Sequence, residues 1–250
     1  MNTLERLCRK RGWRCERTLG RNSWLVSDRD GRRYSVKLAQ CEKSRYFLAN
    51  QMHWQRRSAD YSGDSFVEYS EFEDSAVLLN RYLQGTTLAQ LLRTHWQEQA
   101  SPERVVSCMC ELAQCIEQLH RSGCVHGDLK PSNVLFSQRV TLLDFAAARA
   151  VGEALRTAPY QSYSPHYSIP AFYASTAVVS AHRDWFSYFC MLHIAMFGEP
   201  VQHSQGYVAT DSRQFEACLA AFTQRCEQQA LVSKLQSHHA QLDTFLKALD

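Results

Sequence analysis

The sequence predicts an α+β fold of two lobes, a small β-rich lobe followed by a mainly helical one. A chain of 250 residues with 45% hydrophobic side chains can bury a large core. Strand and turn patterns dominate up to Gly85, and helical periodicity dominates after it. Charge is also divided: residues 1–57 hold 15 basic and 5 acidic side chains (net +10), and residues 58–250 hold 13 and 20 (net −7). We therefore expect lobes at 1–84 and 85–250.

The first lobe is expected to contain short strands and one helix. The segment 25–39 has two β-type runs around Asp30-Gly31, a strong hairpin pattern. The segment 41–57 places Phe47, Met52 and Trp54 near helical spacing. Residues 66–83 alternate apolar and acidic side chains, which predicts two more strands before Gly85 ends the sheet.

The second lobe begins with a helix whose start and end are both marked. Ser101 is a good N-cap, Pro102 fits the first turn, and Gly123 closes the helix. Its apolar positions recur every 3.6 residues: Val105, Val106, Met109, Leu112, Ala113, Ile116 and Leu119. Short strands follow at 134–136 and 140–145, then a loop at 157–176. An apolar helix starts near Asp184; its run at 186–197 is too short to span a bilayer. Helical segments complete the chain.

Ten cysteines are present, but their spacing does not predict a metal site. No CxxC pair occurs, and zinc sites need paired ligands on tight turns. The cysteines at 108, 110 and 115 fall in one helical pattern, where a free thiol acts as a small apolar side chain. The N-terminus is polar and charged, unlike a signal peptide. We expect reduced thiols, a cytoplasmic location and no membrane association.

The densest chemical signal lies between residues 124 and 147. Asp128, Lys130, Asn133 and Asp144 fall within seventeen residues, on a loop and at the end of a short strand. Phosphoryl transfer needs such a set: a carboxylate for the incoming hydroxyl, an amide and a second carboxylate for metal, and a cation beside the base. A polar turn between strands is the alternative, but such turns seldom combine His, Lys-Pro and a second Asp.

In these residues the chain resembles a protein kinase of the bacterial Ser/Thr type. The resemblance implies a bilobal protein kinase-like fold. The segment HGDLKPSN resembles the catalytic loop of that family, and LLDFA resembles its metal-binding motif. The resemblance implies that Asp128 is the catalytic base, that Lys130 sits by the γ-phosphate, and that Asn133 and Asp144 hold Mg²⁺. It also implies that Asp184 ties the apolar helix back to the catalytic loop. The cofactors implied are ATP and Mg²⁺.

The same resemblance assigns nucleotide-binding residues in the first lobe. Lys37, in YSVKL, would anchor the α- and β-phosphates of ATP. Gly20 is the remaining glycine of the phosphate loop, in LGRNSWLV. Asn80 would control access to the back of the nucleotide pocket, and the backbone from Arg81 to Leu83 would contact adenine.

Several positions depart from the family pattern. The helix that should supply a Glu to Lys37 has Gln51 at the best-fitting position, with Glu42 as the nearest earlier acid. Either could pair with Lys37, and an amide would bind it more weakly than a carboxylate. Gly127 replaces the Arg that reads a phosphorylated activation loop, and Ala146 replaces a hinge Gly. The closing motif has Ala-Ser-Thr at 174–176 where a Glu is expected.

Three functions fit this pattern. The first, which we favour, is Mg²⁺-dependent transfer from ATP to Ser/Thr hydroxyls of a protein substrate, because every group expected at the metal and the reacting atoms is present. The second is a small-molecule kinase, sugar or aminoglycoside-like. The third is a pseudokinase that serves as a binding module, which Gln51 and the reduced phosphate loop favour.

The histidines and the Arg-rich start can each be interpreted as structural or as functional. His126 is expected to brace the catalytic-loop backbone, whereas His120, at a helix end, and His238 are expected to be ordinary surface residues. The Arg-rich start at 6–21 is either a solvated surface or a patch for an acidic protein partner. No nucleic-acid-binding motif accompanies it, so nucleic acid is not the expected partner.

Overall fold

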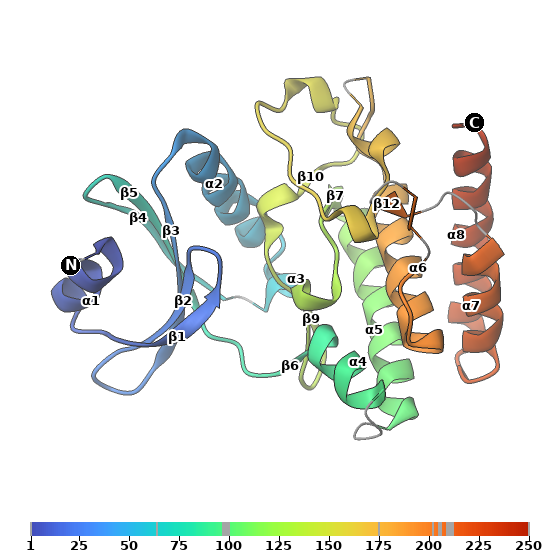
Figure 1. The fold of residues 1–250 in the computed structure, drawn as a ribbon, viewed down its shortest axis with the longest axis horizontal. Helices are drawn as coiled ribbons and strands as arrows, with labels where there is room; N and C mark the ends of the chain where they lie inside the picture. Colours follow the sequence, from blue (N-terminus) through green and yellow to red (C-terminus); the bar gives the residue numbers. More distant parts are fainter. Residues whose placement is uncertain are drawn as a thin grey trace. The chain divides into compact units, whose positions relative to one another are not determined.

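The computed structural model describes residues 2–63, 65–96, 101–174, 176–201, 203–204, 207–208 and 213–249. The chain divides into two compact units, Met1–Gln84 and Gly85–Asp250. Strands predominate in the first and helices in the second, which confirms the predicted α+β class (Figure 1).

The first unit is built on an antiparallel sheet of five strands in the order β1-β2-β3-β5-β4. The strands are β1 (Arg14–Gly20), β2 (Ser23–Ser27), β3 (Arg33–Ala39), β4 (Phe66–Phe72) and β5 (Ser75–Arg81). The predicted hairpin is β2–β3, where Gly31 adopts φ 77° in the turn. That left-handed conformation is the reason a glycine suits this turn.

Two helices cover opposite faces of this sheet. Helix α2 (Glu42–Arg57) packs through Leu48 on the alanine and leucine side chains of β3 and β5. Helix α1 (Thr3–Arg11) packs through Leu4 and Leu7 on the alternate side chains of β2, β3 and β5. Successive side chains of a strand point to opposite faces. Lys37, between Val36 and Leu38 of the α1 face, therefore points toward α2.

The prediction of one helix in this unit is wrong, because α1 and the short α3 (Ala59–Ser62) are present as well. Helix α1 begins with a capping box, in which the side chains of Asn2 and Glu5 each accept the other's backbone N–H at 2.9 Å. It ends at Gly12, which adopts φ 68°. Both cues are visible in the sequence.

The helices of the second unit pack on two buried elements, α5 and α6. The helices are α4 (Leu88–Trp96), α5 (Pro102–Arg121), α6 (His182–Phe197), α7 (Arg213–Thr223) and α8 (Gln229–Lys247). The predicted start of α5 is confirmed, since the Ser101 side chain accepts the N–H of Arg104. All seven predicted apolar positions of α5 are buried. Helix α6 begins two residues before the predicted Asp184.

Short strands carry the loops between these helices. They are β6 (Thr86–Thr87), β7 (Cys124–Val125), β8 (Val134–Phe136), β9 (Val140–Leu142), β10 (Arg149–Ala150), β11 (His203–Ser204) and β12 (Tyr207–Val208). The second predicted strand is shorter than expected: β9 ends at Leu142, and Asp144 already adopts φ 64°. Within the described residues, no helix combines the length and the apolar character needed to cross a membrane.

Candidate active site

A buried carboxylate, Asp184 of α6, holds the loop that follows β7. It accepts the backbone N–H groups of His126 at 2.8 Å and Gly127 at 2.9 Å, and it lies 2.9 Å from Nε2 of His120. Burial opposes its ionisation, but the His120 side chain, His126 and the Gly127 N–H outweigh this and lower the pKa of Asp184. The expected tie between this helix and the catalytic loop is confirmed.

His126 braces the same loop from inside, as predicted. Its Nε2 lies 3.0 Å from the carbonyl oxygen of Leu143, and its Nδ1 lies 3.4 Å from the backbone N of Asp128. One tautomer satisfies both contacts, with the proton on Nε2 and Nδ1 accepting. The imidazole also packs on Phe145, with ring centroids 4.9 Å apart. The loop is thereby attached to the segment that carries Asp144.

Position 127 is occupied by glycine for a steric reason that the sequence does not reveal. Its φ is 78°, and a Cβ at this position would lie 2.7 Å from the carbonyl oxygen of Ala147. Its own carbonyl accepts a hydrogen bond from the Tyr173 hydroxyl at 3.2 Å. An arginine would need space that the backbone at 147 occupies. The absence of the usual Arg therefore follows from backbone packing at this position.

The loop presents one carboxylate beside one cation. Nζ of Lys130 donates to Oδ2 of Asp128 at 2.7 Å and to Oγ of Ser164 at 3.0 Å. The second carboxylate oxygen of Asp128, Oδ1, is buried and has no hydrogen-bond partner among the residues that the structure describes. An unsatisfied buried carboxylate oxygen is costly. It is the kind of atom that a substrate hydroxyl would satisfy.

Asn133 and Asp144 are brought to the same end of the β8–β9 hairpin. Val134 pairs with Leu142 in this hairpin, and the Leu143 N–H donates to the Asn133 carbonyl at 2.8 Å. The Asn133 amide nitrogen donates to the backbone carbonyl of Asp128 at 2.9 Å. That bond orients the side chain and leaves its oxygen for another ligand. Amide and carboxylate oxygens are ligands that Mg²⁺ prefers.

In the first unit, Lys37 pairs with the glutamine rather than with the glutamate. Its Nζ donates to Oε1 of Gln51 at 2.7 Å. Glu42 lies in the first turn of α2, is exposed, and makes no hydrogen bond or ion pair with Lys37 among the described residues. Gln51 is 4% exposed, so this hydrogen bond from the ammonium group to a neutral amide lies in a protected environment. Of the two partners that the sequence left open, Gln51 is the one that the fold brings to Lys37.

A second glutamine, one turn further along α2, anchors the same helix to the sheet. Nε2 of Gln55 donates to Oγ of Ser65 at 2.6 Å and to Oδ1 of Asn80 at 3.0 Å. All three side chains are buried. Asn80, predicted to limit access to the back of the pocket, is thus held by α2. The sequence indicated Asn80 but not Gln55.

The remaining predicted contacts are backbone groups. The Arg81 N–H donates to the Ser65 carbonyl at 2.7 Å, so only its carbonyl could serve adenine. Leu83 makes no backbone hydrogen bond among the described residues. Gly20 ends β1, and a Cβ there would meet nothing within 4 Å, so crowding does not require glycine. The positive φ of this turn, 56°, belongs to Asn22. The roles of Gly20, Arg81 and Leu83 stay predictions.

Two histidines differ from expectation. His120 was predicted to be a surface residue, but its side chain is 11% exposed and contacts Asp184. His238 was predicted to be solvated, but its ring stacks on Trp185 with centroids 3.9 Å apart. Both contacts join residues far apart in sequence, so no local pattern reveals them.

The activation segment supplies residues that sequence reasoning did not assign to the site. Ser164, in the loop predicted at 157–176, contacts Lys130. Tyr173 contacts Gly127 and lies under the guanidinium of Arg183, 4.6 Å from its ring centroid. Within the closing motif, Ser175 lies outside the described residues.

Comparison with known proteins gives a consistent result. The family model described as "Protein kinase domain" matches residues 64–249. A probable serine/threonine-protein kinase of Streptomyces coelicolor is 30% identical over 135 residues, covering 52% of this chain and 20% of the relative. The serine/threonine-protein kinase PknB of Mycobacterium tuberculosis is 27% identical over 129 residues (49% and 20%). The serine/threonine-protein kinase PKH3 of Eremothecium gossypii is 30% identical over 133 residues (50% and 18%).

These matches span about a fifth of the length of the curated relatives. The family match, in contrast, covers more than half of this chain and includes the catalytic loop, the Asn133–Asp144 hairpin and Asp184. The chain belongs to the protein kinase domain family.

Proposed function

We propose that this chain is a kinase that transfers the γ-phosphoryl group of ATP, with Mg²⁺, to Ser/Thr hydroxyls of a protein substrate. The observation that carries the proposal is the Asp128 carboxylate, with Oδ2 bound to Lys130 at 2.7 Å and Oδ1 buried and unpartnered. The Ser/Thr class is supported by the Lys130-Pro131 pair and by the printed names of the relatives.

In the proposed reaction, a substrate hydroxyl donates a hydrogen bond to Oδ1 of Asp128. Its oxygen forms a bond to the γ-phosphorus as the bond from that phosphorus to the β–γ bridging oxygen breaks. The hydroxyl proton passes to Asp128, and ADP leaves with the electron pair of the broken bond. Lys130 offsets negative charge on the transferring group while keeping Asp128 oriented.

Asn133 and Asp144 fit a divalent cation, because the bond from the Asn133 amide nitrogen to Asp128 leaves an amide oxygen beside a carboxylate. When bound, Mg²⁺ would neutralise charge on the phosphates. Lys37, kept in place by Gln51, would bind the α- and β-phosphates. The Gln51 amide is neutral, so this contact does not itself offset the charge of the ammonium group.

The test incubates the purified chain with Mg²⁺, γ-labelled ATP and a generic basic protein. We expect label on Ser/Thr of the chain or of the added protein, and its loss in Asp128→Ala. Asp144→Asn should remove Mg²⁺-dependent ATP binding, and Lys37→Met should lower transfer sharply. Asp60→Ala, which removes an exposed carboxylate of the first unit, is the matched control and should keep wild-type activity.

Other results would overturn the proposal. Transfer only to a small hydroxylated metabolite would make the chain a small-molecule kinase. Absence of any nucleotide-dependent thermal shift, with or without Mg²⁺, would make it a binding module. Full activity of Lys37→Met would refute the role given to Lys37.

A further inference from the structure

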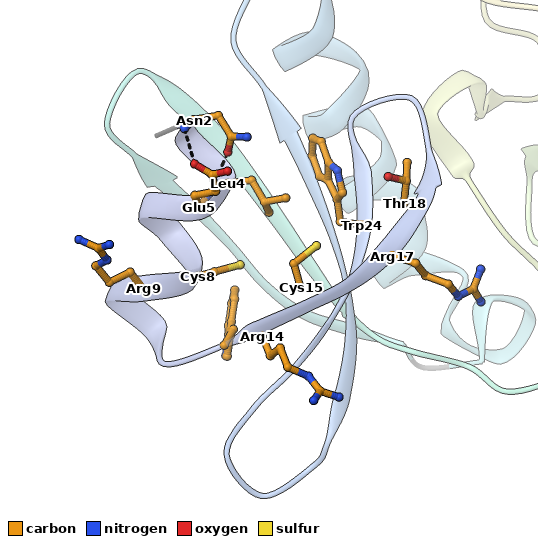
Figure 2. A pocket seen from close by; sticks show the side chains of 11 residues that line it. Asn2, Leu4, Glu5, Cys8, Arg9, Arg14, Cys15, Arg17, Thr18 and Trp24 are labelled. Carbon is orange, nitrogen blue, oxygen red and sulfur yellow. Dashed lines mark hydrogen bonds between the residues drawn. The ribbon is translucent and has the colours of Figure 1, made fainter.

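The first unit has a groove that the proposed reaction does not use. It lies between α1 and the strands β1 and β2 and has a volume of about 760 Å³. Leu4, Cys8, Cys15 and Trp24 surround its interior, as Figure 2 shows, and Trp13 also lines it. Trp24 packs with the α1 cluster, so the groove opens on the sheet face opposite Lys37. An occupant would therefore leave Lys37 uncovered.

The wall formed by α1 is firmly attached. The capping box of Asn2 and Glu5 fixes its start, and Leu7, 1% exposed, anchors it in the sheet. Arg6 pairs with Glu73 and Arg11 with Glu68, both at 2.6 Å. These long-range pairs hold the helix against the β4–β5 hairpin. The groove is thus a feature of the folded unit, with a volume typical of ligand sites.

These ion pairs also divide the basic side chains of residues 1–57, here called the basic cluster, into two sets. Arg6, Arg11 and Arg45 are neutralised internally, by Glu73, Glu68 and Glu71. The side chains of Arg9 and Arg14, which line the groove, are exposed and make no hydrogen bond or ion pair among the described residues. Arg17 also lines it and donates to the Tyr82 hydroxyl at 3.0 Å. In Figure 2 these three arginines stand at the rim, with their guanidinium groups directed outward.

The lining also includes Asn2 and Glu5, whose capping box already engages the Glu5 carboxylate. Three arginines against this one carboxylate leave the rim positively charged. An apolar interior with such a rim matches one kind of occupant. A carboxylate-rich peptide with an apolar side chain at its centre would place that side chain between the tryptophans and its acids at the arginines. Strand β1 is an edge strand, but its pairing with β2 shifts register twice. Such bulges disfavour continuous strand addition, so side chains rather than a shared ladder would carry recognition.

We propose that this groove docks an acidic segment of a partner protein, with one large apolar side chain in the interior and flanking carboxylates on Arg9 and Arg14. This surface is independent of the proposed phosphoryl transfer. The proposal gives a binding role to part of the excess positive charge of residues 1–57, namely to arginines that internal ion pairs do not neutralise.

Cys15 provides a reporter inside the groove. Cys15 and Cys41 are exposed, whereas Cys8 is buried, and burial raises the pKa of its thiol to about 11. A Cys41→Ser chain would be labelled at Cys15 with an environment-sensitive fluorophore. The probe is the peptide Asp-Glu-Glu-Phe-Asp-Glu-Asp, compared with one that has Ser for Phe and one that has Asn/Gln for Asp/Glu.

We expect a saturable blue shift with the first peptide only. The double variant Arg9→Glu/Arg14→Glu should weaken its binding at least about tenfold, because two exposed ion pairs become repulsive. The control Arg93→Glu/Arg139→Glu changes two exposed arginines of the second unit by the same total charge and should leave binding unchanged. Circular dichroism would confirm that both variants fold.

Three results would overturn the proposal. No saturable shift with the acidic peptide would refute an acidic occupant. Equal binding of the peptide that has Ser for Phe would show surface charge alone, without use of the groove interior. A dimer in sedimentation that Arg9→Glu/Arg14→Glu abolishes would make the occupant a second copy of this chain.

Discussion

Replacing Gly127 by alanine tests how the catalytic loop is packed. Gly127 has φ 78°, and a Cβ would lie 2.7 Å from the carbonyl oxygen of Ala147. That oxygen belongs to backbone, which cannot rotate away as a flexible side chain could. The neighbouring peptide groups are also committed, because the Gly127 N–H donates to buried Asp184 and its carbonyl accepts from Tyr173.

The cost has two parts that a control can separate. A left-handed conformation costs a non-glycine residue about 1–2 kcal/mol. Relieving an overpacked contact costs about 1–3 kcal/mol more. Gly123 adopts φ 82°, but a Cβ there would meet nothing within 4 Å. Gly123→Ala should therefore show the first cost only, and Gly127→Ala should show both.

Urea unfolding and thermal melting measure the difference. We expect Gly127→Ala to melt about 2–12 °C below Gly123→Ala, from about 2–4 °C for each kcal/mol in a chain of this size. Because Asp128 is the next residue, the shift should also reduce phosphoryl transfer, by about tenfold or more. Gly123→Ala should keep most of its activity.

Equal stability and equal activity of the two variants would refute this reasoning. So would an active, stable Gly127→Arg, since that side chain needs the same space. Either result would return the missing arginine to a purely regulatory explanation.

Three further predictions concern other contacts. Gln51→Glu should stabilise the first unit by about 1 kcal/mol, because a carboxylate acceptor for the Lys37 ammonium group replaces a neutral amide; urea unfolding with no gain, or a loss, would contradict this. Asp184→Asn should destabilise the chain by about 3–5 kcal/mol, since an amide cannot accept from both His126 and Gly127 as the carboxylate does; Asp60→Asn, at an exposed position of α3, is the control and should cost less than about 1 kcal/mol. Hydrogen bonds from Arg11 and Arg6 lower the pKa of Glu68 and Glu73 below the ordinary 4.5. Their stabilisation is complete above about pH 4.5 and is lost as the pH falls through the lowered values, so melting curves of Arg6→Gln/Arg11→Gln should depend less on pH in this range than those of wild type.

Several elements of the fold were predictable because their cues lie within a few residues. The N-cap at Ser101 and the apolar spacing of α5 predicted that helix and its buried face. Asp30-Gly31 predicted the β2–β3 hairpin. The capping box at Asn2 and Glu5 is an equally local cue for α1, a helix that was not predicted.

The candidate site also has features that the sequence predicts locally and features that depend on distant contacts. Asp128, Lys130, Asn133 and Asp144 lie close together in sequence, and their residue types indicate phosphoryl transfer without any structure. Whether they come together depends on hairpin pairing and on Asp184, which is 57 residues from Gly127. The motif therefore predicted the chemistry, and packing produced the geometry.

The sequence by itself determined the family and the α+β class and predicted the reacting groups, because short patterns encode backbone preference and chemical type. Only the tertiary structure decided which acceptor Lys37 uses and why position 127 is glycine. It also decided that part of the basic cluster is neutralised by acids 57 and 67 residues away. These outcomes depend on contacts between distant segments, which form only when hydrophobic faces pack and bring particular side chains within hydrogen-bond reach.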